Sequence, residues 1–187
     1  MMDSTTLNTI AEQIEGKSKR LPPIEKWNPD FSGDLDMRIA RDGRWYYLGS
    51  EIKRSAMVKL FSTILLREDD EYFLVTPVEK YRIVVEVAPF IAISVQKKVD
   101  DQSREPALVF ETNVGDWVVA GPDNPIRVVI DSVTEEPTPL ITVRRNLEAL
   151  ISRNVFYQLV DQADVEQGDT NELYVTSLGS RFSLGKF

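Results

Sequence analysis

The sequence predicts an α+β protein built from a duplicated unit of antiparallel strands plus one helix. Two observations predict the duplication. A Gly-x-Trp-x-x-x-Gly signature occurs at residues 43–49 and again at residues 115–121. Around each copy the pattern of apolar residues indicates the same order of strand pair, helix and strand pair, which is how an internal repeat shows itself in a sequence. The composition, 42% hydrophobic and 28% charged, is that of an ordinary globular protein with a packed core.

The first unit is expected to follow an amphipathic helix within residues 4–16 and a connector that ends at Pro22-Pro23. Its first hairpin lies within residues 36–48, because the Asp42-Gly43 pair is a strong hairpin signal. An apolar stripe of helical period predicts a helix over residues 54–67. The strands expected after it cover residues 72–76, 81–87 and 91–97.

The second unit is expected to contain a helix over residues 146–160 and a closing hairpin around Gly179. Its helix stripe Leu147, Leu150, Ile151 matches the stripe Met57, Leu60, Phe61, and its strand 173–176 matches 73–76. Residues 122–139 add a hairpin that the first copy lacks. The strands expected before the helix cover residues 108–111, 117–120, 126–130 and 140–143. The expected divisions are 1–20 for the N-terminal helix and linker, 21–100 for the first repeat and 101–187 for the second.

The charge and the missing residue types exclude several classes of function. The formal net charge is −8, whereas binding to nucleic acid or to an anionic membrane needs clustered Lys and Arg. The chain has no Cys and no His, which removes thiolate chemistry, Ser-His-Asp triads and imidazole metal sites. We therefore predict no catalytic residues, no metal, no cofactor, no nucleic-acid partner and no membrane partner. With no signal peptide or apolar span in the sequence, we expect a cytoplasmic location.

The segment Thr76-Pro77-Val78-Glu79-Lys80 is the strongest candidate for a binding loop. It places a hydroxyl, a carboxylate and an amine beside a rigid proline between two apolar strands. The alternative interpretation is a hairpin turn with a surface ion pair, which contributes little energy. The matching segment of the second copy, residues 176–180, lacks the Glu and the Lys, so we expect any site to lie in the first copy.

Arginines provide the second set of candidates, since a guanidinium binds phosphate in a bidentate manner. Arg38 and Arg41 flank the start of the first hairpin, and Arg144 lies at the expected start of the second helix. Asn113, in the second signature turn, completes the set. The alternative is that these arginines pair with the abundant acidic residues. The ligand-binding residues we predict are Arg38, Arg41, Thr76, Glu79, Lys80, Asn113 and Arg144.

Carboxylates offer a third possibility, a metal-dependent hydrolase. Asp34 and Asp36 would share one face of a strand, and residues 68–71 are all acidic. A carboxylate-only magnesium site is chemically possible without His or Cys. The alternative, which we favour, is a solvated turn in each case.

Several longer segments resemble the bacterial domain-of-unknown-function family 1285, from about Leu21 to the C-terminus. They are Pro22-Pro23, Trp27-Asn28-Pro29, residues 33–43, Leu60-Phe61-Ser62, residues 72–80, residues 112–116 and Ala120-Gly121-Pro122. The resemblance implies a duplicated α+β unit, a second domain similar to pleckstrin-homology-like folds, a ligand cleft between the two domains and a signalling role with a nucleotide-like ligand. It implies no catalytic residues.

The sequence therefore favours a small-molecule-binding or regulatory module over an enzyme. The main alternative is a protein–protein adaptor that uses an exposed strand edge. The metal-dependent hydrolase is the third hypothesis.

Overall fold

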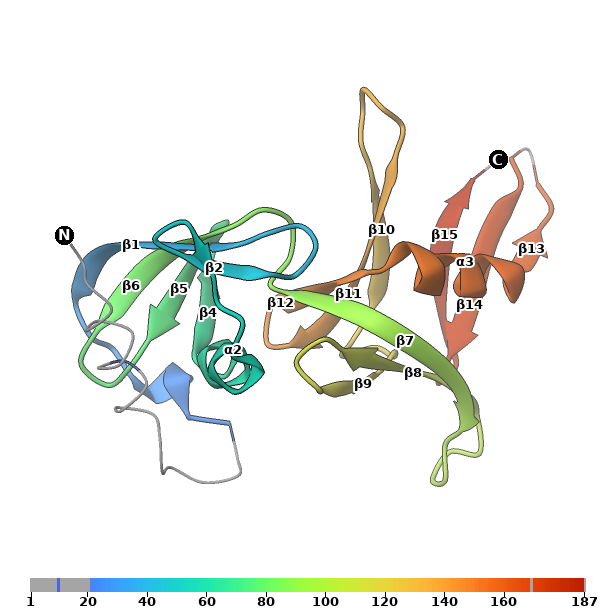
Figure 1. Ribbon diagram of the computed structural model, residues 1–187. Coiled ribbons are helices and arrows are strands. Elements are labelled where there is room, and N and C mark those ends of the chain that lie inside the picture. The colour runs from blue at the N-terminus through green and yellow to red at the C-terminus, as the bar shows by residue number, and fades with distance from the viewer. Residues whose placement is uncertain (1–9, 11–20, 169, 187) are drawn as a thin grey trace. The chain divides into compact units, whose positions relative to one another are not determined.

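The computed structural model describes residue 10, residues 21–168 and residues 170–186, which form two compact units divided between Val87 and Ala88 (Figure 1). The helix expected within residues 4–16 lies outside the described residues, except for Ile10, which is helical and buried. The division expected at residues 100 and 101 coincides with a hairpin turn inside the second unit. A polar stretch serves such a turn as well as it serves a linker, so composition alone does not distinguish them.

The first unit is a six-stranded sheet in the order β3-β2-β1-β6-β5-β4, with one α-helix, α2, inserted between the strands of the two edges. Its first and last strands, β1 and β6, are parallel neighbours, and the other pairs are antiparallel. The elements in chain order are η1 (Ile24–Lys26), β1 (Phe31–Ile39), β2 (Trp45–Tyr47), β3 (Ser50–Glu51), α2 (Ser55–Ser62), β4 (Leu65–Glu68), β5 (Glu71–Val75) and β6 (Lys80–Val85).

The core of this unit lies between the inner face of the sheet and α2. The side chains of Leu35, Met37 and Ile39 alternate along β1 and are buried, as the two-residue period of a strand requires. Phe61 of α2 stacks on Trp45 of β2, with ring centroids 6.5 Å apart and an interplanar angle of 28°. The hairpin expected around Asp42-Gly43 is confirmed as the turn between β1 and β2.

The second unit contains a six-stranded sheet in the order β9-β8-β7-β12-β11-β10 and a three-stranded sheet formed near the C-terminus. The expected closing hairpin around Gly179 is confirmed as β14 and β15. The elements in chain order are β7 (Phe90–Val99), β8 (Pro106–Thr112), β9 (Trp117–Val119), β10 (Ile126–Ile130), β11 (Pro137–Arg144), β12 (Leu147–Ile151), α3 (Arg153–Asp161), β13 (Asp164–Glu166), β14 (Glu172–Ser177) and β15 (Ser180–Lys186).

The predicted α+β duplication is confirmed by strand order. Numbered within its own unit, each six-stranded sheet runs 3-2-1-6-5-4, and in each the first strand is parallel to the sixth. The two copies of the Gly-x-Trp-x-x-x-Gly signature begin with turns of the same geometry. The N–H groups of Gly43 and Gly115 each donate to a carbonyl three residues earlier at 2.9 Å, and both glycines have a positive φ, 86° and 84°.

The residue-by-residue matches within the repeat were wrong, however. The first signature turn joins strands one and two of its unit, whereas the second joins strands two and three. Trp45 is consequently 1% exposed, while Trp117 on the edge strand β9 is 53% exposed. The matched strand 173–176 belongs to the additional three-stranded sheet. The short signature therefore revealed that the unit is duplicated, but it did not show which residues of the two copies correspond.

The prediction of a helix over residues 146–160 was also wrong for the first part of that range. Residues 147–151 form β12, and α3 begins only at Arg153. The central strand β12 is buried on both faces, so its apolar residues do not alternate with polar ones. A short continuous apolar run of this kind has no period that separates a buried strand from a helix.

A buried hydroxyl and a backbone bond beside it link the three-stranded sheet to the rest of the second unit. Ser177, which is fully buried, donates its Oγ–H to the carbonyl of Ala120 at 2.7 Å and accepts the N–H of Leu108 at 2.8 Å. The neighbouring N–H of Leu178 donates to the carbonyl of Pro106 at 2.9 Å. These bonds place β14 against β8, and β15 lies beside β10.

The two tryptophans of the signature provide a matched pair of variants. We expect Trp45→Ala to reduce the free energy of unfolding by about 3–5 kcal/mol, since it leaves a cavity beneath Phe61. Trp117→Ala should cost less than about 1 kcal/mol, because an exposed ring loses little on truncation. Urea unfolding followed by circular dichroism measures both, and equal costs for the two variants would contradict the burial described above.

Candidate functional site

The predicted binding loop holds its own hairpin together. Thr76 is buried, and its Oγ1 accepts the N–H groups of Val78 at 3.3 Å and Glu79 at 3.0 Å. The Tyr81 hydroxyl donates to Glu79 at 3.0 Å; burial first, and this carboxylate second, raise the pKa of Tyr81. These contacts stabilise the turn between β5 and β6, and they occupy the hydroxyl and the carboxylate that the sequence assigned to a ligand.

Lys80, the third member of that loop, is engaged on the outer face of the sheet. Its Nζ lies 2.6 Å from a carboxylate oxygen of Glu68 and 4.5 Å from the centre of the Phe73 ring. Its side chain is only 18% exposed. The lysine therefore covers the Phe73 ring and bridges β6 to β4.

Arg38 and Arg41 meet at one carboxylate. Arg38 Nη1 lies 2.5 Å from Glu86 Oε1, and the backbone N–H of Arg41 donates to Glu86 Oε2 at 2.8 Å. The guanidinium of Arg38 also lies 4.4 Å from the centre of the Tyr46 ring. The hydrogen bond from the N–H of Arg41 and then the hydrogen bond from the Arg38 side chain lower the pKa of Glu86. The structure thus brings these two predicted residues together, around an acidic partner.

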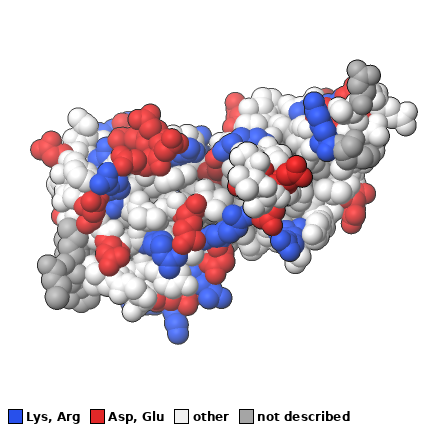
Figure 2. Space-filling model, turned by 90° about the horizontal axis from the view of Figure 1, so that it is seen from above, with Lys and Arg blue, Asp and Glu red and all other residues white. Residues whose placement is uncertain are grey.

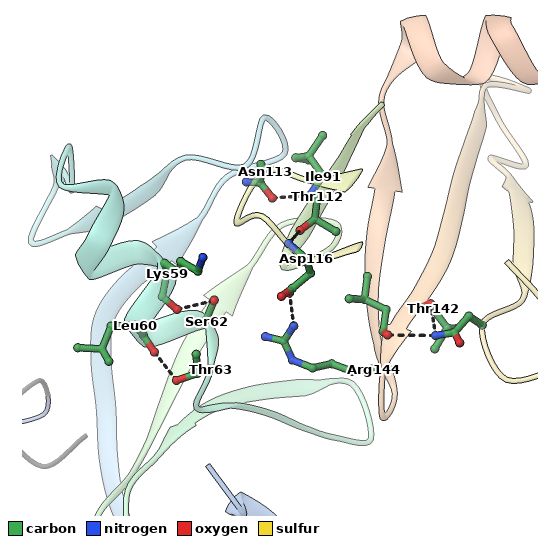
Figure 3. Close-up of polar contacts among 12 residues, drawn as sticks. Lys59, Leu60, Ser62, Thr63, Ile91, Thr112, Asn113, Asp116, Thr142 and Arg144 are labelled. Carbon is green, nitrogen blue, oxygen red and sulfur yellow. Dashed lines mark hydrogen bonds and ion pairs between the residues drawn. The ribbon is translucent and has the colours of Figure 1, made fainter. Parts of the chain in front are cut away.

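The two predicted residues of the second unit also have structural partners (Figure 3). Asn113 Oδ1 accepts the N–H of Ile91 at 3.0 Å, which ties the β8–β9 turn to β7. Arg144 forms an ion pair with Asp116 of the same turn and lies 4.7 Å from the centre of the Phe90 ring. The Arg144 side chain is 12% exposed. Both residues therefore position the signature turn.

Four of the acidic residues considered for a metal, Asp34, Glu68, Asp70 and Glu71, form ion pairs with arginines or a lysine. Arg82 binds Asp34 in a bidentate manner, at 2.7 and 3.1 Å, and reaches Glu71 at 2.7 Å. Within the described part of the chain, no group of three or more Asp and Glu side chains is arranged to hold a metal ion. A groove of about 520 Å³ runs beside Arg82 between β1, β5 and β6.

A larger groove, of about 800 Å³, lies in the second unit between the edge strands β10 and β15. One wall is β10, which contributes Ile126, Val128 and Ile130. The ionisable groups at the groove are Arg127, Glu135 and Lys186. Its volume is in the range of small-molecule and peptide sites. We call it the β10–β15 groove.

The cations of this groove differ in their surroundings. Arg127 binds Glu148 in a bidentate manner, at 2.6 and 2.8 Å, so its charge is largely balanced within the protein. Lys186 is exposed, and no ion pair or hydrogen bond of its side chain is found among residues 21–168 and 170–186. Lys186 is thus the residue best placed to meet an anionic group.

The sequence did not predict the β10–β15 groove, because the residues that form it have no distinctive local pattern. The run Ile126-Arg127-Val128-Val129-Ile130 reads as any half-buried strand. Only the strand order shows that this strand is an edge and that the C-terminal strand lies next to it. The exposed apolar residues of the hairpin, Val129, Ile130 and Val133, were the available signal.

The charge distribution agrees with the composition. On the face shown in Figure 2, acidic and basic side chains are interspersed, and no continuous basic surface is visible. No helix of the described chain is long and apolar enough to cross a membrane.

The fold defines a class of protein, a duplicated α+β unit whose two six-stranded sheets have the same strand order. The edge strands of the two sheets differ. The chain belongs to the DUF1285 family: residues 22–88 match its N-terminal domain, a "domain of unknown function", and residues 89–184 match its C-terminal domain. The predicted family is thereby confirmed. The pleckstrin-homology-like character of the second domain stays a prediction.

Two solved structures are similar to this chain. A DUF1285 family protein from Silicibacter pomeroyi DSS-3 is 49% identical, with a TM-score of 0.86 over 96% of this chain and 94% of that one. A DUF1285 family protein from Shewanella baltica OS155 is 28% identical, with a TM-score of 0.52 over 68% of this chain and 91% of that one. No curated protein matches the chain.

The bidentate ion pair of Asp34 and Arg82 leads to a prediction about pH. The hydrogen bonds from Arg82 lower the pKa of Asp34. A carboxyl group whose pKa is lower in the folded state stabilises the fold at pH values above its pKa in the unfolded chain, near 3.9. That contribution is lost as the pH falls through the pKa of the folded state. We expect Arg82→Gln to raise the pKa of Asp34 toward 3.9, as measured by carboxyl ¹³C NMR titration. The same titration should show little change at Asp131, whose pKa is lowered by N–H groups of its own turn. An unchanged Asp34 titration would contradict the pairing.

Proposed function

We propose that the protein is a regulatory binding module whose ligand carries a negative charge and occupies the β10–β15 groove. The observation that carries the proposal is the combination of a groove of about 800 Å³, an apolar wall and an exposed lysine in a chain of net charge −8. Among the described residues, the side chain of this lysine has no carboxylate partner. Its position at the rim of the groove would orient an anionic group there while the apolar wall contacts the rest of the ligand.

The small-molecule hypothesis takes a more specific form in this groove. A nucleotide-like ligand would place a phosphate at Lys186 and its base against Val128 and Ile130. Six of the seven residues first proposed for ligand binding have side-chain partners, and Arg41 is engaged through its backbone N–H, which favours the groove over the Thr76–Lys80 loop as the place to test. The adaptor hypothesis remains open, because β10 is also an exposed strand edge.

The proposal is tested by thermal unfolding in the presence of AMP and GMP, with adenosine as the uncharged control. A ligand at about 100 times its Kd stabilises the folded state by about 2.7 kcal/mol. We expect the nucleotides to raise the Tm of the wild type and adenosine to leave it unchanged. Lys186→Glu should abolish the shift, because it reverses the charge that meets the phosphate.

The matched control is Lys53→Glu, which makes the same charge change at an exposed lysine of the first unit. It should keep the nucleotide-dependent shift. A shift that survives in Lys186→Glu, or that is lost equally in both variants, would place the binding outside the β10–β15 groove.

A further inference from the structure

Among the described residues, strand β10 pairs with β11 on one side, and no strand pairs with its other side. The N–H of Thr142 donates to the carbonyl of Pro125 at 3.1 Å, and the N–H of Asp131 donates to the carbonyl of Glu136 at 3.1 Å. In an antiparallel pair the hydrogen-bonded positions alternate, so these two bonds and the register of β10 with β11 fix the pattern. Arg127 and Val129 point their N–H and carbonyl groups toward β11. Those of Ile126, Val128 and Ile130 therefore point away from it.

The same three residues line the β10–β15 groove. Within residues 21–168 and 170–186, the backbone groups of Ile126, Val128 and Ile130 that face away from β11 have no backbone hydrogen-bond partner. Ile126 is only 5% exposed, so Val128 and Ile130 supply the accessible groups of this edge, two donors and two acceptors at alternate positions of the strand. Backbone groups of this kind bind water or another extended chain.

The other edges of the two six-stranded sheets are protected. In the first unit, β3 has two residues, and β4 has Arg67 and Glu68 at its end. In the second unit, β9 has three residues. Short strands and charged side chains are the usual means by which proteins prevent pairing at an edge. The five-residue strand β10 is longer than each of these, and its Val129 and Ile130 are 43% and 52% exposed.

From this edge and the proposed function of the groove, on which the inference rests, we infer that the ligand is an extended peptide with an acidic residue. Its backbone would pair with Val128 and Ile130 as an added strand. Its carboxylate would meet Lys186 on the β15 side of the groove. Main-chain hydrogen bonds then supply affinity, and the lysine supplies selectivity for the acidic residue.

Charge separates this occupant from a second copy of the chain. Two copies each carry a net charge of −8, and the hairpin that ends β10 adds Asp131, Glu135 and Glu136 close to the edge. Pairing of β10 with β10 of another copy would bring these acidic groups together. A peptide with a single carboxylate avoids that repulsion and still complements Lys186.

The inference is tested with a phage-displayed library of random ten-residue peptides selected on the wild-type protein. Enriched peptides are synthesised with a fluorescent label and measured by fluorescence anisotropy. We expect them to contain an acidic residue. Val128→Pro should weaken binding at least tenfold, because proline removes an N–H that points into the groove while leaving every bond to β11 in place. The matched control Val128→Ala shortens the same side chain but keeps that N–H, so it should weaken binding clearly less than Val128→Pro does.

Peptides with N-methylated amides test the same pairing without altering the protein. Methylation at alternate residues in one register should weaken binding at least tenfold, and methylation in the other register should not, because only one set of amides faces β10. Lys186→Glu should weaken binding at least tenfold, and Lys53→Glu should not.

Peptides that bind wild type and Val128→Pro equally, or that tolerate methylation in both registers, would overturn strand addition. If no peptide is enriched while AMP or GMP binds in a Lys186-dependent manner, the peptide inference fails and the proposed function stands. If neither peptides nor nucleotides bind, both fail.

Discussion

The parallel pairing of the first and last strands organises each unit. With β1 beside β6 and β7 beside β12 in the centre, the third and fourth strands necessarily lie at the two edges of the sheet. These edge strands follow one another in the chain. In the second unit only residues 120–125 join β9 to β10, a link that reaches roughly 20–25 Å. Six flat strands would hold their edges about 24 Å apart. The link contains a turn in which Gly121 and Asn124 bond each other, so it is shorter than its full extension and the two edges approach.

The approach of the two edges alone would leave β10 exposed to solvent along its whole length. The C-terminal segment changes this, because Ser177 joins the β14–β15 hairpin to β8 and β9 from within the core. A hydroxyl suits this junction, since it donates to one strand and accepts from the other at the same point. With β14 fixed in this way, β15 lies beside β10 without pairing with it. The β10–β15 groove is the space that remains between two sheets that do not merge.

Local signals in the sequence predicted the local structure well. Asp42-Gly43 and Gly179 specify hairpin turns through backbone angles that few other residues adopt, and both turns are confirmed. Leu147 and Leu150 misled because a central strand buried on both faces lacks alternation. The duplication was predictable from repeated patterns, but Trp45 and Trp117 occupy different strands of the repeat. Strand order depends on contacts distant in the sequence, and a single sequence does not record them.

The candidate site could not be predicted from side-chain type alone. Thr76, Glu79, Lys80 and the arginines were selected because their side chains are reactive toward ligands, yet these side chains bind equally well to the protein itself. In an acidic chain with 30 Asp and Glu residues against 22 Lys and Arg, carboxylate partners for such cations are abundant within the protein. The groove, by contrast, is formed largely by backbone groups and by valine and isoleucine, which sequence patterns assign to the core.

The two copies of the unit have diverged at their edges. Short strands and terminal charges protect the edges of the first unit, whereas β10 keeps apolar, exposed residues and backbone groups that face outward. An edge of that kind promotes aggregation unless something opposes it. The acidic residues of the adjoining hairpin and the net charge of −8 oppose self-pairing through repulsion, and they do so without covering the edge. The acidic charge opposes contact between two copies of the chain and leaves Lys186 accessible, which favours an occupant other than the protein itself. The second unit is therefore the more promising half in which to search for that occupant.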